Sequence, residues 1–166
     1  MGTIDDTAGF PVTRTSRSLV PPSSATPRET LRLSVIDRVA GLRHLVRSLH
    51  VFAGDNKPAA AKAPQAKALR EALGKALVDY YPFAGRFVGA EDGEVRVACT
   101  GEGAWFVEAA AACSLEEVRH LDHPMLIPKE ELLPEPAPDV NPLDMPLMMQ
   151  VCVCCDHCTI YISMHA

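Results

Sequence analysis

The stretch Pro64–Arg86, with the sequence PQAKALREALGKALVDYYPFAGR, constrains the fold of this chain more than any other part. Its apolar residues recur every three or four positions, at Ala66, Leu69, Leu73, Ala76, Leu77 and Tyr80. This spacing predicts an amphipathic helix with one buried face. Pro82 must end the helix because it has no N–H to donate and its ring clashes with the preceding turn. We expect Gly85 to adopt a positive φ, so that the chain turns into an extended run from Arg86 to Val88.

Alternation of apolar and polar residues predicts strands before and after this helix. The expected strands are residues 10–20, 31–37, 95–99, 104–109 and 145–151. The Asp92–Gly93 pair between two alternating runs predicts a hairpin, whereas residues 41–52 fit either a strand or a helix. Ser114, with Glu117 three residues later, forms a capping-box pattern that predicts a short helix over residues 115–121.

A proline-punctuated crossing over the surface is expected at residues 123–146. Within it, Glu130 and Glu131 are interpreted as the solvated start of a short helix rather than as a pair of catalytic carboxylates. Trp105 occupies a strand position, where a tryptophan usually belongs to the core.

The composition excludes several classes of protein. Hydrophobic residues make up 48% of the 166 residues and charged residues 22%, which fits a globular domain and excludes wholesale disorder. The formal net charge of −5 argues against a nucleic-acid binder. No apolar run approaches the ~18 residues needed to span a bilayer, and the N-terminus lacks a signal-sequence pattern. We therefore expect a cytoplasmic protein that binds neither nucleic acid nor membranes.

Several ordered strings resemble the plant BAHD acyltransferases, which transfer an acyl group from coenzyme A to an alcohol or amine. Leu33–Asp37 (LSVID) is similar to the family's early L-S-x-x-D string, and Tyr80–Arg86 (YYPFAGR) to its Y-Y-P-x-A-G-R signature. Cys99–Glu108 (CTGEGAWFVE) is similar to the family's C-x-G-x-G-x-x-F-x-E. Pro146–Val151 (PLMMQV) resembles the strand that leads into the catalytic histidine.

The resemblance carries expectations about fold and substrates. It implies an α/β fold of two chloramphenicol-acetyltransferase-like domains, each a mixed sheet with flanking helices, of which this chain would be a truncated first domain. Residues 41–50 (GLRHLVRSLH) and 121–134 (LDHPMLIPKEELLP) look closest to the grass enzymes that transfer p-coumaroyl from coenzyme A to monolignols. Acyl-CoA would be a co-substrate, an alcohol such as a monolignol the acceptor, no cofactor would be bound, and the enzyme would be monomeric.

The same resemblance suggests roles for particular residues. The family's general base is a histidine in an H-x-x-x-D motif, which takes the hydroxyl proton of the acceptor. His44 and Arg38 are candidates for the wall of the acceptor pocket. We interpret a further set as structural residues that hold the fold together through polar contacts and turns. This set is Asp37, Tyr80, Tyr81, Pro82, Gly85 and Arg86.

The residues after Val151 depart from the family pattern. The family reads Q-V-T-x-F-x-C-G-G-F where this chain reads QVCVCCDHCT, and His165 lies closer to Gln150 than the family's base does. His165 is therefore out of register and only a weak candidate for the base. We predict three parts: a disordered N-terminus at residues 1–9, a partial acyltransferase domain at 10–151, and a divergent cysteine-rich tail at 152–166.

Cysteines and histidines are crowded in this tail, at Cys152, Cys154, Cys155, His157, Cys158 and His165. Thiolates and imidazoles are ligands for zinc or copper(I). A structural zinc site usually has two well-spaced pairs of ligands, whereas the tail has one crowded group. We therefore expect no metal site.

Two functions from different classes follow. By family resemblance, the chain belongs to an acyl-CoA-dependent O-acyltransferase that moves a hydroxycinnamoyl group, such as p-coumaroyl, to an alcohol. The alternative is a non-catalytic splice or read-through fragment with at most a binding or interaction role. Because no histidine stands in the register of the family's base, we predict that the chain alone is inactive.

Overall fold

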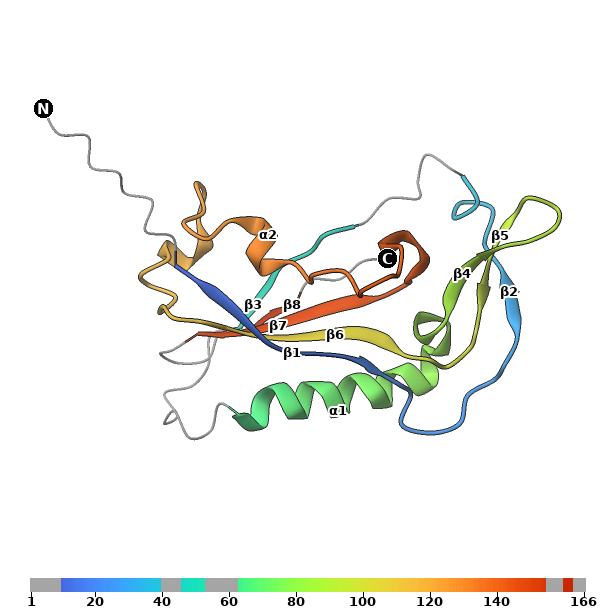
Figure 1. Ribbon diagram of the computed structural model, residues 1–166, viewed down its shortest axis with the longest axis horizontal. Coiled ribbons are helices and arrows are strands. Elements are labelled where there is room, and N and C mark those ends of the chain that lie inside the picture. Colours follow the sequence, from blue (N-terminus) through green and yellow to red (C-terminus); the bar gives the residue numbers. More distant parts are fainter. Residues whose placement is uncertain (1–9, 40–45, 53–62, 155–159, 163–166) are drawn as a thin grey trace, which may run out of the picture.

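The computed structural model describes residues 10–39, 46–52, 63–154 and 160–162, which form two sheets and two α-helices (Figure 1). The strands are β1 Val12–Val20, β2 Thr30–Arg32, β3 His50–Phe52, β4 Arg86–Gly89, β5 Val95–Ala98, β6 Ala104–Ala111, β7 Met148–Cys154 and β8 Ile160–Ile162. The α-helices are α1 Ala63–Asp79 and α2 Lys129–Leu132, and short 3-10 helices span Tyr81–Ala84, Arg119–Leu121 and Pro142–Asp144. No helix in the described ranges is long and apolar enough to cross a bilayer.

The larger sheet is mixed and has the strand order β1-β6-β7-β8-β3. Its central pair, β6 and β7, is parallel, whereas the pairs β1–β6, β7–β8 and β3–β8 are antiparallel. Parallel neighbours need a long crossover connection, and residues 112–147 provide it on the sheet face opposite α1 (Figure 1). The expectation of an α/β fold with a mixed sheet and flanking helices is confirmed.

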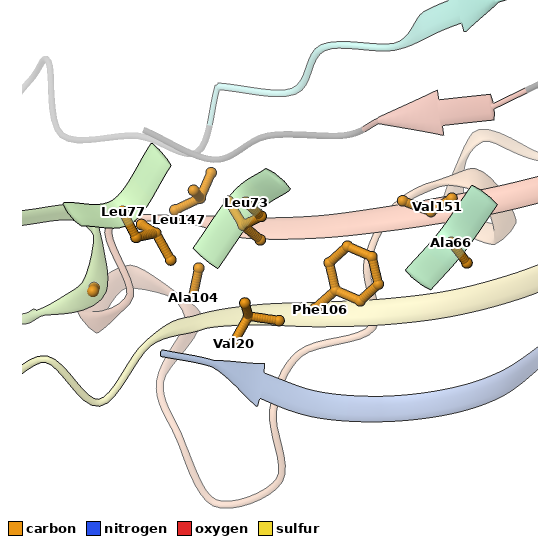
Figure 2. Close-up of a cluster of buried hydrophobic side chains, with 9 residues drawn as sticks. Val20, Ala66, Leu73, Leu77, Ala104, Phe106, Leu147 and Val151 are labelled. Carbon is orange, nitrogen blue, oxygen red and sulfur yellow. The ribbon is translucent and has the colours of Figure 1, made fainter. Parts of the chain in front are cut away.

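Helix α1 packs on one face of this sheet through the apolar stripe that its sequence predicts. Figure 2 shows Ala66, Leu73 and Leu77 of the helix against Val20, Ala104, Phe106, Leu147 and Val151. Leu77 is 1% exposed and Phe106 0%, and burying a side chain of this size stabilises the fold by about 1.5–3 kcal/mol.

Two members of the predicted stripe are exposed, so the prediction is wrong for Ala76 and Tyr80. Ala76 lies at the edge of the inward face of the helix. Tyr80 follows Asp79, the last residue of α1, so the helical repeat no longer sets its direction.

The crossover covers the opposite face of the sheet. Trp105 and Val107 of β6 pack there with Met145 and Met148. A second cluster on this face contains Ala109, Ala111, Cys113, Val118, Ile127, Leu132, Cys152 and Cys154. Strands β6 and β7 are therefore buried on both faces, which explains their nearly continuous apolar sequence.

The smaller sheet has the order β2-β5-β4 and lies at one end of the larger one (Figure 1). Strands β4 and β5 form the predicted hairpin, with Gly93 in its turn at a φ of 77°. Strand β2 ends at Arg32, so the prediction of a strand over residues 31–37 is wrong beyond that point. The hydroxyl of Ser34 accepts from the Asp37 N–H at 3.2 Å and donates to its carboxylate at 2.7 Å, and this local turn replaces the strand ladder.

The capping box at Ser114 and Glu117 is confirmed, but the helix it predicted is not. The Ser114 N–H donates to the Glu117 carboxylate at 2.7 Å, and the Glu117 N–H donates to the Ser114 hydroxyl at 3.1 Å. Residues 115–118 then form a turn, and the next three residues have φ values of 51°, 53° and 61°. These positive φ values are incompatible with a right-handed α-helix.

Strand β7 continues past Val151 to Cys154, and its antiparallel partner β8 pairs Ile162 with Val151. The sheet therefore extends into residues 152–166. Whether that part is a divergent tail stays a prediction. The expected disorder of residues 1–9 lies outside the described residues. Of residues 41–52, the structure describes 46–52, which include strand β3.

The backbone conformation of Gly85 differs from the predicted one. Its φ is −97° and its ψ is −157°, so the expected positive φ is wrong. A Cβ at this position would lie 2.3 Å from the carbonyl oxygen of Ala98 in β5. Glycine is needed here because two backbone segments approach closely.

Gly85→Ala should therefore lower the free energy of unfolding by about 1–3 kcal/mol, because the opposing atom is backbone and cannot rotate away. Gly89→Ala is the matched control, since a Cβ there meets nothing within 4 Å. Urea denaturation of both variants measures the difference. Equal destabilisation by the two substitutions would show that the close approach at Gly85 is not the reason for its glycine.

Candidate functional site

Gln150 lies at the centre of β7 and has 0% of its surface exposed. Within Met148–Cys154, it is the only residue whose side chain carries an amide, a hydroxyl or a charge. Its Nε2 donates to the carbonyl oxygen of Glu131 at 2.8 Å, and its Oε1 accepts from Nε of Arg14 at 3.2 Å. Because both ends of the amide are paired, its burial is tolerated.

Arg14 extends from β1 toward the same part of the fold, and its side chain is 17% exposed. Its Nη1 lies 3.2 Å from Oε2 of Glu131. Its Nη2 donates to the carbonyl oxygens of Glu130 at 3.1 Å and Leu133 at 3.5 Å. With the bond to Gln150, the guanidinium has four acceptors, which suits its planar, multi-donor geometry.

We call residues 129–135, which begin with α2, the strap. Its end is bound by two more side chains: Nε of Arg17 in β1 donates to Oε2 of Glu135 at 2.7 Å, and Nε1 of Trp105 in β6 donates to the carbonyl oxygen of Glu135 at 2.8 Å. Polar side chains of β1, β6 and β7 thus hold the strap against the sheet, on the face opposite α1 (Figure 1). We call Arg14, Glu131 and Gln150 the polar network.

Cys152 follows two residues after Gln150 on the same face of β7 and is fully buried. Burial raises the pKa of its thiol from 9.0 to about 12, and the neighbouring Cys154 and Cys113 act in the same direction. A buried neutral thiol is neither a nucleophile nor a metal ligand at physiological pH. Cys152 therefore has a structural role in the described core.

This raised pKa makes stability depend on pH in a defined direction. The folded state keeps the thiol of Cys152 protonated to about pH 12, whereas the unfolded chain loses the proton near pH 9.0. The free energy of unfolding should therefore fall as the pH rises above the lower value. Urea melts at about pH 8 and about pH 10 measure this slope. In Cys152→Ala the slope should be shallower, and an unchanged slope would contradict the assignment.

The structure places Arg38 and Asp37 at the smaller sheet. Nη1 of Arg38 lies 2.9 Å from Oε1 of Glu94. Nη2 of Arg32 lies 2.9 Å from Oε2 of the same carboxylate. These two guanidinium groups lower the pKa of Glu94. Arg38 and Asp37 are thus bound to local partners and do not join the polar network. The role of Arg38 in an acceptor pocket stays a prediction.

The YYPFAGR segment links the end of α1 to two other parts of the chain. The hydroxyl of Tyr81 donates to Oε1 of Glu29 at 2.6 Å, and this bond to a carboxylate raises the pKa of Tyr81. Nη1 of Arg86 donates to the carbonyl oxygen of Gly103 at 3.0 Å, and Nη2 lies 3.2 Å from Oε2 of Glu102. Pro82 lies in the 3-10 helix Tyr81–Ala84. Tyr80 is 64% exposed and adds little to the core.

The candidate for the acceptor pocket, His44, and the weak candidate for the base, His165, lie outside the described residues. The same holds for Cys155, His157 and Cys158, so the expectation about metal binding by the tail stays a prediction. Among the described residues, no group of three or more His, Cys, Asp or Glu side chains is placed to hold a metal ion.

A hollow of about 290 Å³ lies along the proline-rich crossing between β1 and β2. Its lining residues are Pro22, Ser24, Ala25, Thr26, Arg28 and Gly101. Neither a histidine nor a carboxylate is among these lining residues, so the hollow offers no general base.

The sequence did not predict the polar network. The expected helix start at Glu130 and Glu131 is confirmed, because both lie in the first turn of α2. Glu131, whose side chain is 42% exposed, also binds Arg14 through its carboxylate and Gln150 through its carbonyl oxygen. Two signals could have indicated the network. Gln150 interrupts an otherwise apolar strand. Arg14 stands at one of the alternate positions of β1 whose side chains are partly buried.

A family model described as "Transferase family" matches residues 10–163 of the chain. The match continues through most of residues 152–166, where the sequence led us to expect the family likeness to end. The divergent character of residues 152–166 stays a prediction.

Curated relatives match most of the chain. Acyl transferase 4 of Oryza sativa subsp. japonica is 62% identical over 154 residues, covering 86% of this chain and 34% of the rice protein. Myricetin 3-O-glucosyl 1,2-rhamnoside 6'-O-caffeoyltransferase AT1 of Crocosmia x crocosmiiflora is 47% identical, covering 86% of this chain and 32% of that protein. Taxadien-5-alpha-ol O-acetyltransferase of Taxus chinensis is 39% identical, covering 79% of this chain and 30% of that protein. The chain spans about a third of the length of these relatives.

Among solved structures, the crystal structure of vinorine synthase resembles this one with a TM-score of 0.68. The likeness covers 93% of this chain and 37% of vinorine synthase, at 22% sequence identity. At this identity the likeness shows that the two proteins share a fold.

Proposed function

Because the chain belongs to the transferase family, as a plant BAHD acyltransferase, we propose that it forms the part of an acyl-CoA-dependent acyltransferase that carries the strand leading to the general base. The observation that supports this most directly is the setting of β7. This strand is buried on both faces, is bound by the polar network, and pairs with the antiparallel strand β8. Such a closely packed strand is a suitable support for a base that must be positioned accurately.

In the proposed reaction, the hydroxyl oxygen of an alcohol attacks the carbonyl carbon of the acyl thioester. The base takes the hydroxyl proton, the carbon–sulfur bond breaks, and coenzyme A leaves as the thiol. Binding donor and acceptor side by side removes much of the entropic barrier to this attack. By the family resemblance, we propose a monomeric, cytosolic enzyme that uses acyl-CoA as a co-substrate and binds no cofactor.

We propose a hydroxycinnamoyl group as the acyl group. Two relatives from Crocosmia x crocosmiiflora that are 47% and 45% identical to this chain are named caffeoyltransferases, whereas the named acetyltransferase is 39% identical. A monolignol is the first acceptor to test, on the basis of the sequence likeness at residues 41–50 and 121–134.

A chimera tests the proposed function, because the chain spans only a third of its relatives. Residues 10–154 of this chain replace the aligned residues of the rice acyl transferase that is 62% identical. We expect the chimera to release coenzyme A from p-coumaroyl-CoA in the presence of coniferyl alcohol, and more slowly from acetyl-CoA. The unaltered rice protein is the control. A folded chimera that transfers no acyl group to any alcohol, while the rice protein does, would contradict the proposal.

The second candidate, a chain that is non-catalytic by itself, is favoured by the position of His165, which is out of register with the family's base. We expect the 166-residue polypeptide alone to transfer no acyl group from p-coumaroyl-CoA to coniferyl alcohol above the uncatalysed rate. Product formation measured by chromatography checks this expectation. Turnover that disappears in His165→Ala would overturn it.

A further inference from the structure

We propose that Gln150 is a positioning residue: it fixes the register of β7 against its neighbours, and thereby the place of the paired strands β7 and β8 relative to the strap. The catalytic consequence of this inference rests on the proposed function. Its structural part, the register of β7, stands without it.

The apolar pattern of β7 specifies its register only weakly. Met148, Cys152 and Cys154 share one face of the strand with Gln150, while Met149, Val151 and Val153 share the other. A shift of two residues keeps every side chain on its own face, and even a shift of one residue mostly exchanges one apolar side chain for another. The hydrophobic effect alone therefore distinguishes poorly between neighbouring registers.

The amide of Gln150 removes this ambiguity. In a register shifted by two residues, Met148 or Cys152 would occupy its position and could not supply both the donor for the Glu131 carbonyl and the acceptor for Arg14. These buried polar groups would lose their partners, and the amide itself would move into an apolar environment, each at a cost in free energy. A single buried polar residue fixes register in coiled coils by the same physics.

The partners of Gln150 are themselves fixed in place. Arg14 is bound to the Glu131 carboxylate and to the carbonyl oxygens of Glu130 and Leu133, and the far end of the strap is bound to Trp105 at 2.8 Å. Strand β1 and the strap thus form a frame against which the amide of β7 is aligned. Arg14 and Gln150 are 136 positions apart in the sequence, so their bond aligns two distant segments.

The functional consequence follows from the dimensions of a strand. A shift of two residues moves the chain by about 6.6 Å along the strand axis. In the whole enzyme of the proposed function, the base follows β7 in the chain, and a misplacement of about 1 Å can lower a catalysed rate by on the order of a hundredfold. Gln150 would therefore affect turnover without touching substrate.

The test uses the chimera described above. Gln150→Met keeps the length of the side chain but removes both hydrogen bonds. Met149→Leu is the matched control, because Met149 is the next residue to Gln150 and lies on the opposite face of the strand. It is only partly buried, against the apolar residues beneath α1. A second control, Leu77→Ala, destabilises the core through α1 but leaves the hydrogen bonds of Gln150 in place. The measurements are kcat, KM for p-coumaroyl-CoA, the melting temperature, and deuterium exchange of the β7 amides.

We expect Gln150→Met to lower kcat by on the order of tenfold to a hundredfold, to leave KM within about twofold, and to speed exchange in β7. Met149→Leu should change none of these measurably. Leu77→Ala should lower the melting temperature at least as much as Gln150→Met, but it should leave kcat, measured well below the melting temperature, within about twofold of the parent. A merely structural role predicts that the two variants lose kcat in proportion to their loss of melting temperature, and that result would overturn the proposal. A kcat within about twofold of the parent in Gln150→Met would overturn it as well.

Two further outcomes are decisive. If the parent chimera folds but transfers no acyl group, the proposed function fails, and exchange alone decides the register claim: faster exchange of β7 in Gln150→Met supports it and unchanged exchange overturns it. If Gln150→Met does not fold, Gln150→Glu takes its place, because it keeps an acceptor for Arg14 but loses the Nε2 donor to the Glu131 carbonyl oxygen. In Gln150→Glu, faster exchange in β7 with reduced kcat supports the inference, whereas native values of both overturn it.

Discussion

The parallel pair of strands β6 and β7, buried on both faces, is the constraint on which the rest of this structure depends. A strand pair of this kind needs an apolar cover on each side. Helix α1 supplies one cover through Leu73 and Leu77, and the crossover supplies the other through residues such as Ile127 and Leu132. The same crossover also makes the parallel connection between β6 and β7. Residues 112–147 must therefore both connect the two parallel strands and cover one face of them with apolar side chains.

The two covers are attached by different physics. The interface of α1 is a continuous apolar stripe, so its stability comes mainly from removing surface from water. The strap contributes Leu132 to the core, but its backbone is bound by Arg14, Gln150 and Trp105. An ion pair as exposed as Arg14–Glu131, whose carboxylate side is 42% exposed, adds little net stability. The larger effect of such a network is to select one arrangement among several of similar apolar burial.

Local sequence signals predicted the local parts of this fold. The helix over Ala63–Asp79, the β4–β5 hairpin and the buried strands followed from periodicity and from turn residues, which depend on neighbours in the chain. The failures lie where distant contacts decide. Gly85 is needed because of Ala98 in another strand. The polar network joins residues that only the folded topology brings together, since Arg14 and Gln150 lie on strands separated by β6. The strand predicted over residues 31–37 is wrong for a local reason instead, because the Ser34 hydroxyl competes with the strand ladder.

The family resemblance suggested what periodicity could not, namely that β7 is the strand that leads to a general base. The structure adds how that strand is held: between two covers, with one amide at its centre. Because both covers depend on the same strand pair, we expect them to unfold together as one cooperative unit. Urea unfolding of the chain, followed by two probes, measures whether they do. Far-UV circular dichroism reports mainly on α1, and fluorescence of the single tryptophan, Trp105, reports on the strap side. Coincident transitions are the predicted result, and a strap side that melts at a lower urea concentration than the helix would contradict it.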